Sequence, residues 1–160
     1  MGKFLSFIIS LILVAGTTSC SSNGCSENQS SIPLAGFYSI ETGEKIAMNA
    51  IEISGVGAES LLTSGNETVQ QTYLPLRSSQ TSAAFCFHYN DFGDDAAYND
   101  TVWIEYTSTP YFASEECGAM FQYEIKSISH TNIIIDSVAV IDPIVNNIDV
   151  ERIKIFFKTN

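Results

Sequence analysis

The amino-acid sequence predicts an all-β protein, an antiparallel β-sandwich of about eight strands with an immunoglobulin-like or similar topology. Short runs rich in aromatic and β-branched residues follow one another, separated by turn-forming glycine, asparagine, aspartate and serine. Several runs alternate apolar with polar residues, which is the period of a strand with one buried face. From Leu34 onward no stretch shows a convincing helical period. Strands without intervening helices favour antiparallel pairing.

The first twenty residues are organised as an export signal. Lys3 supplies one positive charge, and residues 4–15 are apolar apart from two serines. This run is shorter than the ~20 residues that span a bilayer, but it has the length of the apolar part of a signal peptide. Residues 16–19 are small and lead to Cys20. The length and the flanks disfavour a buried N-terminal helix.

This arrangement resembles the lipobox of bacterial lipoproteins, where the cysteine thiol carries diacylglycerol and the chain is cut just before it. Thr17 stands where leucine is usual. We expect residues 1–19 to be a lipoprotein signal peptide and Cys20 to be the lipidated residue. The alternative is an ordinary signal peptide that leaves Cys20 a plain thiol. Cys25 is a poorer acylation site because it lies farther from the apolar run.

The remaining chain divides into a tether and one domain. Residues 20–33 are mostly small and polar, as in a flexible linker. Residues 34–160 suffice for a single domain with its own core. An acidic surface-export signal directly after Cys20 is not apparent. We therefore expect a lipid-anchored protein of the cell envelope, on the outer membrane and facing the periplasm.

The charge excludes one class of partner. The formal net charge is −11 at pH 7, whereas nucleic acids and anionic headgroups attract proteins through Lys and Arg. We expect no nucleic-acid partner. The chain would reach the membrane through acylated Cys20, and its partner would be an envelope protein or a glycan.

The cysteines indicate one disulfide. Exported proteins keep disulfides, and three cysteines remain once Cys20 carries lipid. Cys86 lies inside an apolar run, where a free thiol behaves as a small buried hydrophobe. Cys25 and Cys117 lie in turn-like contexts, and we predict that they pair.

The strands expected in the N-terminal half are 35–40, 45–54, 69–77 and 82–90. The first ends at a Glu-Thr-Gly-Glu turn signal, and the second alternates isoleucine with glutamate. Pro75 cannot donate to a ladder, so the third strand should lie at an edge or end there. The fourth places its aromatic residues on one face and Cys86 on the other.

The strands expected in the C-terminal half are 101–106, 118–129, 132–141 and 150–158. In the first, Val102 and Ile104 alternate with Trp103, which should therefore point outward. The second alternates in the same way. The third is apolar on both phases and suits a central strand. In the fourth, the apolar residues change phase near Glu151, which predicts a bulge.

Four runs resemble a family of small Bacteroidota lipoproteins with a domain of unknown function. They are Tyr-Leu-Pro-Leu-Arg at 73–77, the run 114–125, Asp-Ser-Val at 136–138 and Ile-Lys-Ile-Phe-Phe at 153–157. The resemblance covers the chain from about Cys25 to the end. The resemblance implies a lipid-anchored envelope domain in which Cys117-Gly118 has a structural role. It supplies no catalytic residues.

The sequence contains no signature of an enzyme. His88 and His130 have no ligand-type spacing to each other or to a cysteine. No nucleophile elbow, phosphate-binding loop or zinc-protease motif is present. We expect a non-catalytic protein without a cofactor.

The best metal candidate is an acidic loop at 90–100. Calcium binds six to eight oxygens, which carboxylates, asparagines and backbone carbonyls supply. The carboxylates of the loop are those of Asp91, Asp94, Asp95 and Asp100. Their spacing does not follow the EF-hand order, and a solvated hairpin loop without metal is the favoured interpretation.

An outward-facing Trp103 is the best candidate for ligand binding. An exposed tryptophan marks an interface, and its ring can stack on a sugar. Tyr98 and Tyr111 are candidates to complete a glycan site. Thr101 and Ser137 lie in Asp-Thr-Val and Asp-Ser-Val tripeptides, which resemble the O-glycosylation acceptors of exported Bacteroidota proteins. We expect a binding or assembly module, with a glycan-binding lipoprotein as the alternative.

Overall fold

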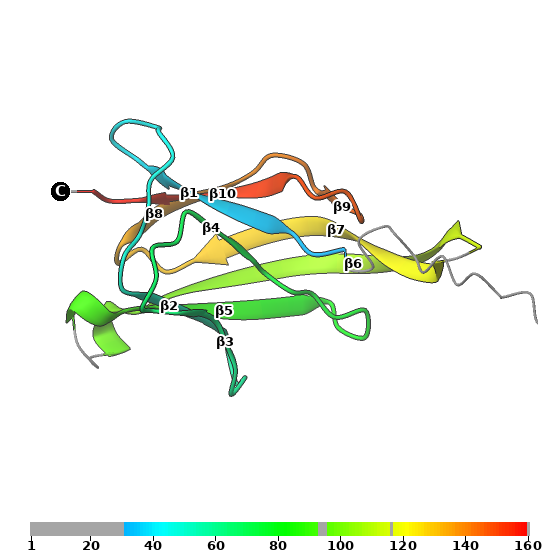
Figure 1. Ribbon diagram of the computed structural model, residues 1–160, viewed down its shortest axis with the longest axis horizontal. Coiled ribbons are helices and arrows are strands. Elements are labelled where there is room, and N and C mark those ends of the chain that lie inside the picture. Colours follow the sequence, from blue (N-terminus) through cyan, green and yellow to red (C-terminus); the bar gives the residue numbers. More distant parts are fainter. Residues whose placement is uncertain (1–30, 93–95, 116, 160) are drawn as a thin grey trace, which may run out of the picture.

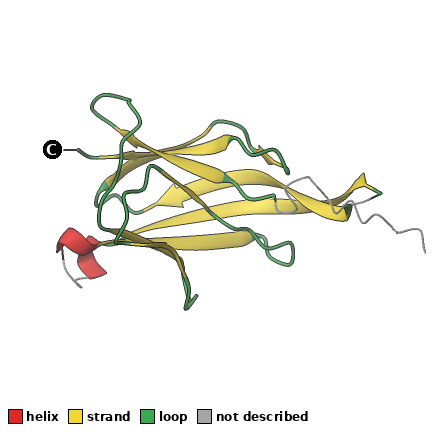
Figure 2. Ribbon diagram, viewed as in Figure 1, coloured by secondary structure: helices red, strands yellow, loops and turns green. Residues whose placement is uncertain are grey.

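A computed structural model describes residues 31–92, 96–115 and 117–159 of the 160-residue chain. These residues form two β-sheets packed face to face (Figures 1 and 2). The strands are β1 (Leu34–Ser39), β2 (Ile51–Gly55), β3 (Leu61–Ser64), β4 (Gln71–Tyr73), β5 (Ser82–Tyr89), β6 (Asp100–Ser114), β7 (Gly118–His130), β8 (Ile135–Val140), β9 (Ile144–Val145) and β10 (Glu151–Phe157). Two short 3₁₀ helices, η1 (Asn90–Phe92) and η2 (Ala96–Tyr98), precede β6.

The expected β-sandwich is confirmed, with ten strands in the described residues rather than about eight. One sheet has the strand order β4-β1-β10-β8, and the other has the order β3-β2-β5-β6-β7-β9. The strand expected to be central, β8, therefore lies at an edge of the smaller sheet. All neighbouring strands are antiparallel except β1 and β10, which are parallel. Because β1 and β10 are the first and last strands, their parallel pairing joins the two ends of the domain, which local patterns in the sequence do not reveal.

The core lies between the inner faces of the two sheets. Phe37 of β1 and Phe157 of β10 are fully buried and meet edge to face, with ring centroids 5.2 Å apart. From the other sheet, the buried rings of Tyr106 and Tyr123 meet in the same way at 5.5 Å. Isoleucines and valines of β2, β6, β8 and β10 fill the space between these aromatic pairs.

The strand boundaries follow the predicted patterns where the signal is local. The edge strand β4 ends at Tyr73, two residues before Pro75, as the proline predicts. The ladder between β1 and β10 shifts register next to Glu151, where a bulge was predicted. The expected strand at 45–54 is shorter, because regular pairing with β5 begins only at Ile51. Residues 31–33, expected to belong to the tether, pack against the body through buried Ser31 and Pro33.

The hairpin of β6 and β7 is the longest feature of the fold. The strands have 15 and 13 residues, and their tip projects beyond the rest of the sandwich (Figure 1). The sequence predicted a strand only to Tyr106, but β6 continues through Pro110. Past Tyr106 the pairing of β6 is with β7 alone, and a strand with one free side tolerates a residue that has no N–H.

A buried carboxylate joins the two sheets where β6 begins. Asp100 is fully buried, and both its oxygens accept hydrogen bonds. The donors are the Tyr89 hydroxyl at 3.0 Å, the Thr131 hydroxyl at 2.7 Å, and the backbone N–H groups of Ile133, Ile134 and Ile135 at 2.9, 2.7 and 2.8 Å. Ile133 and Ile134 belong to the connection from β7 in one sheet to β8 in the other, and Ile135 is the first residue of β8.

The outer face of the four-stranded sheet carries a polar network around Glu151. Its carboxylate accepts a hydrogen bond from Tyr38 at 2.7 Å and pairs with Lys45 at 3.1 Å. Lys154 lies over the Tyr38 ring, 4.5 Å from its centroid. The hydrogen bond to Glu151 is the main cause that raises the pKa of Tyr38 to about 12. Gly36 leaves room for this carboxylate, since a Cβ there would collide with it.

Replacing Asp100 with asparagine should destabilise the domain by about 3 kcal/mol or more. Hydrogen bonds to a charged group contribute ~1.5–3 kcal/mol each, and the amide nitrogen of asparagine cannot accept the hydrogen bonds that one carboxylate oxygen accepts. Urea unfolding followed by circular dichroism measures the change. Glu105→Gln, on the exposed side of the same strand, is the control and should change stability by less than ~0.5 kcal/mol. A loss below about 1 kcal/mol for Asp100→Asn would contradict the structural role of this carboxylate.

The raised pKa of Tyr38 allows a test of its hydrogen bond to Glu151. The folded protein favours the neutral hydroxyl of Tyr38. The contribution of this preference to the free energy of unfolding is therefore complete below pH 10 and is lost as the pH rises towards 12. Subtracting the ultraviolet titration of Tyr38→Phe from that of the wild type isolates this group. Glu151→Ala should bring the pKa back towards 10, whereas the exposed Glu124→Ala should leave it unchanged. An unshifted pKa in Glu151→Ala would refute the assignment.

Candidate functional site

Trp103 lies in the middle of the broader sheet, on its outer surface. It belongs to β6, which has β5 on one side and β7 on the other. Its flanking partners are Ala84 of β5 and Ser129 of β7, both short side chains. As the alternation predicts, Val102 and Ile104 are buried, whereas Trp103 is 42% exposed. We call Ala84, Thr101, Trp103, Glu105 and Ser129 the Trp103 face.

Polar groups border the Trp103 face. Glu105 accepts a hydrogen bond from the Ser127 hydroxyl at 2.8 Å. On β5, the His88 Nδ1 lies 2.8 Å from the Asn99 side-chain oxygen. Cys86 is half-buried opposite Thr101, and burial raises the pKa of its thiol, with a further contribution from the charge of Asp100. The thiol therefore stays protonated near neutral pH and is a weak nucleophile.

The structure does not gather the predicted aromatic residues around Trp103. Tyr111 lies farther along β6, about 26 Å away at the rise of a β-strand, and its hydroxyl faces the Met120 sulfur at 3.9 Å. Tyr98 is exposed in η2, before β6 begins. A further tyrosine, Tyr89 on the inner side of β5, is buried and donates a hydrogen bond to Asp100.

Asp100 does not lie in the acidic loop where the sequence placed it. It is the first residue of β6, and its oxygens already accept the five hydrogen bonds described above, so it has no lone pairs directed at a loop-bound calcium ion. Asp91 is exposed in η1, while Asp94 and Asp95 lie outside the described residues. In the part of the chain that the structure describes, no three His, Cys, Asp or Glu side chains gather as a metal site.

The other positions that the sequence singles out are half-buried within strands. Thr101, an expected O-glycosylation acceptor, lies in β6 and pairs with Cys86. Ser137, the second acceptor, lies in β8 and pairs with Phe156. His130 at the end of β7 contacts the backbone oxygen of Thr131 at 2.6 Å. The modification expected at either acceptor stays a prediction.

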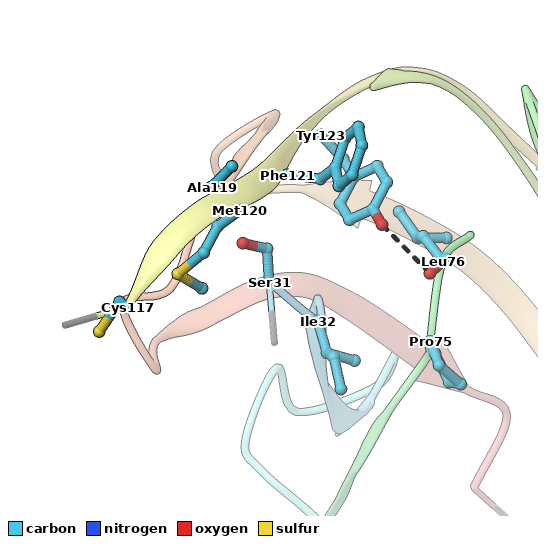
Figure 3. A pocket seen from close by; sticks show the side chains of 9 residues that line it. All are labelled: Ser31, Ile32, Pro75, Leu76, Cys117, Ala119, Met120, Phe121 and Tyr123. Carbon is cyan, nitrogen blue, oxygen red and sulfur yellow. Dashed lines mark hydrogen bonds between the residues drawn. The ribbon is translucent and has the colours of Figure 1, made fainter. Parts of the chain in front are cut away.

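A cavity of ≈ 490 Å³ lies where the described chain enters the sandwich (Figure 3). It opens between residues 31–32, the turn after β4 and the first half of β7. Its lining residues are Ser31, Ile32, Pro75, Leu76, Cys117, Ala119, Met120, Phe121 and Tyr123. The Tyr123 hydroxyl donates to the Leu76 carbonyl at 3.4 Å. No local pattern in the sequence indicates this cavity, because its walls come from three distant segments.

Cys117, on the wall of this cavity, is disulfide-bonded, and Cys86 is a free thiol. Cys25, the partner predicted from the sequence, lies outside the described residues, as does Cys20. The pairing of Cys25 with Cys117 therefore stays a prediction.

Two further cavities flank the shorter strands. One of ≈ 340 Å³ lies between the β2–β3 turn and the loop before β5, and one of ≈ 490 Å³ runs beside β3 and β4. Trp103 lines none of the three cavities. Of the Trp103 face only Ala84 lines one of these cavities, the one of ≈ 340 Å³, and Trp103 itself lies on the outer surface of the sheet. No helix within residues 31–92, 96–115 and 117–159 is long and apolar enough to span a bilayer.

Comparison with known proteins identifies a family but no activity. No curated protein and no solved structure matches the chain. Residues 50–157, which run from the start of β2 to the end of β10, match a family of unknown function. Because this match covers well over half of the sequence, the chain belongs to the family of unknown function DUF6452.

Proposed function

We propose that this protein is a lipid-anchored, non-catalytic binding module of the cell envelope, on the outer membrane and facing the periplasm. Its partner is another envelope protein, which docks on the Trp103 face. The observation that carries the proposal is the 42% exposure of Trp103 at the centre of the six-stranded sheet.

The surroundings of Trp103 support a protein-binding role. Tryptophan is enriched at interface centres, because one side chain buries 150–250 Å² while ordering few rotatable bonds. Ala84 and Ser129 on either side are short, so a partner can approach the indole closely. The sheet beneath is rigid, since Val102 and Ile104 are buried in its core. A partner would therefore meet a surface that needs little ordering on binding.

A glycan is the second candidate. The short flanking side chains leave the indole open for stacking on a sugar ring, and the Glu105 carboxylate beside it can accept hydrogen bonds from hydroxyl groups. Glycan sites are usually concave, whereas Trp103 lines none of the three cavities described above and Tyr111 is distant. The protein partner is therefore favoured.

The anchor in this proposal is the lipidated Cys20, left as the first residue after residues 1–19 are removed. With Cys20 acylated and Cys86 free, Cys25 is the remaining cysteine available to the disulfide of Cys117. The apolar run at 4–15 and the small residues before Cys20 support this assignment.

The anchor and the disulfide predict the covalent state of the mature protein. Mass spectrometry should find acyl chains on an N-terminal Cys20, and denaturation without reductant should expose one reactive thiol, that of Cys86. Cys20→Ser should release the protein from the membrane fraction, whereas Cys86→Ser should not. An unmodified N-terminus would refute the lipid anchor, and three reactive thiols would refute the disulfide.

Replacing Trp103 with alanine should weaken partner binding by about 2 kcal/mol, roughly 30-fold, as at an interface hot spot. Cross-linking in detergent-solubilised envelopes identifies the proteins that the wild type captures, and titration with each purified protein gives its affinity. Ile141→Ala, which also truncates an exposed apolar side chain, is the matched control.

Three outcomes separate the candidates. Loss of binding in Trp103→Ala and not in Ile141→Ala supports the protein partner. Binding to a glycan array that disappears in Trp103→Ala supports the glycan instead. If the wild type, Trp103→Ala and Ile141→Ala capture the same partner equally well and the glycan array shows no binding, a binding role for the Trp103 face is contradicted.

A further inference from the structure

We infer that the tip of the β6–β7 hairpin rests on the surface of the membrane to which the chain is anchored, with exposed phenylalanine side chains in the headgroup region. This inference rests on the lipid anchor proposed above and assigns a second role to the hairpin.

The hairpin carries an unusual apolar face near its tip. Pro110 pairs with Phe121, and Phe112 pairs with Ala119, so these four residues share one side of the two-stranded ribbon. All four are exposed, Phe112 by 69% and Phe121 by 41%. We call them the hairpin apolar face.

The shape of the sandwich explains why, among the described residues, no strand of the opposite sheet covers this face. The strands of the opposite sheet have at most seven residues, against 15 in β6 and 13 in β7. The hairpin therefore projects beyond the layer that would cover it (Figure 1). Burying a phenylalanine side chain is favourable by about 1.5–3 kcal/mol, so the two exposed phenylalanines, which lie diagonally across the ribbon, favour contact with an apolar environment.

The position of the anchor indicates what that environment is. The described chain begins at Ser31, which lines the same cavity as Phe121 and as Cys117 in the hairpin turn (Figure 3). Eleven residues, 20–30, precede it from the lipidated Cys20, and an extended chain of that length spans at most about 40 Å.

The proposed disulfide shortens this reach further. With Cys25 joined to Cys117, the path from the lipid to the hairpin turn has only five residues, about 18 Å when extended. Cys117 lies in the turn next to Gly118, the first residue of β7. The hairpin tip is therefore the part of the body held nearest to the bilayer.

The charges at the tip limit the kind of lipid. Glu115 is exposed in the turn, and the whole chain is acidic at −11. Anionic headgroups repel such a surface. The partner is therefore a bilayer of zwitterionic lipid, with the phenyl rings at the boundary between headgroups and acyl chains, where apolar side chains of surface-bound segments lie.

The single tryptophan of the chain allows a direct test. The mature lipidated protein is reconstituted into phosphatidylcholine vesicles whose acyl chains are brominated, because bromine quenches only indoles that touch the lipid. Phe112→Trp in a Trp103→Phe background reports on the hairpin apolar face. The wild type is the matched control, since its Trp103 lies about 30 Å away along β6.

The fluorescence of Trp at position 112 should fall about twofold or more in brominated vesicles relative to unbrominated ones, while that of native Trp103 stays unchanged. Replacing a third of the lipid with phosphatidylglycerol should reduce the quenching. Phe121→Trp in the same background is a second reporter, and circular dichroism verifies that each variant is folded.

Flotation of the vesicles distinguishes failure of this inference from failure of the proposed anchor. Protein that does not float has no lipid anchor, which overturns both. Protein that floats while neither reporter is quenched keeps its anchor but overturns the membrane contact, and leaves the hairpin apolar face for a protein partner. Equal quenching at positions 103 and 112 overturns the specific role of the hairpin.

Discussion

The buried carboxylate of Asp100 is the interaction on which the rest of the fold depends. It ties three elements together, since its donors come from β5 and from the connection that carries the chain from β7 in one sheet to β8 in the other. Five hydrogen bonds offset the cost of removing a charge from water. Without them, three consecutive N–H groups at 133–135 would be left unpaired beside the core.

Asp100 also sets the orientation of β6. Side chains alternate along a strand, so a first residue that must point inward places Val102 and Ile104 inside and Trp103 outside. The same phase continues past Tyr106 to Pro110 and Phe112 on the hairpin apolar face. The inward phase shared by Asp100, Val102, Ile104 and Tyr106 therefore places different aromatic side chains on two separate surfaces.

The two surfaces divide the proposed roles along a single strand. The hairpin end of β6 lies beside the entry of the N-terminal arm, where the lipid anchor would hold the domain. The Trp103 face lies about 30 Å away by strand geometry. In the function that we propose, one end of β6 meets the membrane, and the middle of the six-stranded sheet stays accessible to a partner.

The sequence by itself determined the features that depend on neighbouring residues: the all-β class, the outward direction of Trp103, the end of β4 before Pro75 and the bulge next to Glu151. Only the tertiary structure decided the parallel pairing of β1 with β10, the burial of Asp100 and the extension of β6 past Pro110. The physical reason is the range of the interactions. Alternation and turn propensity act over a few residues. The groups that donate hydrogen bonds to Asp100, in contrast, lie 11 to 35 positions away along the chain. No local pattern in the sequence indicates which distant groups will meet.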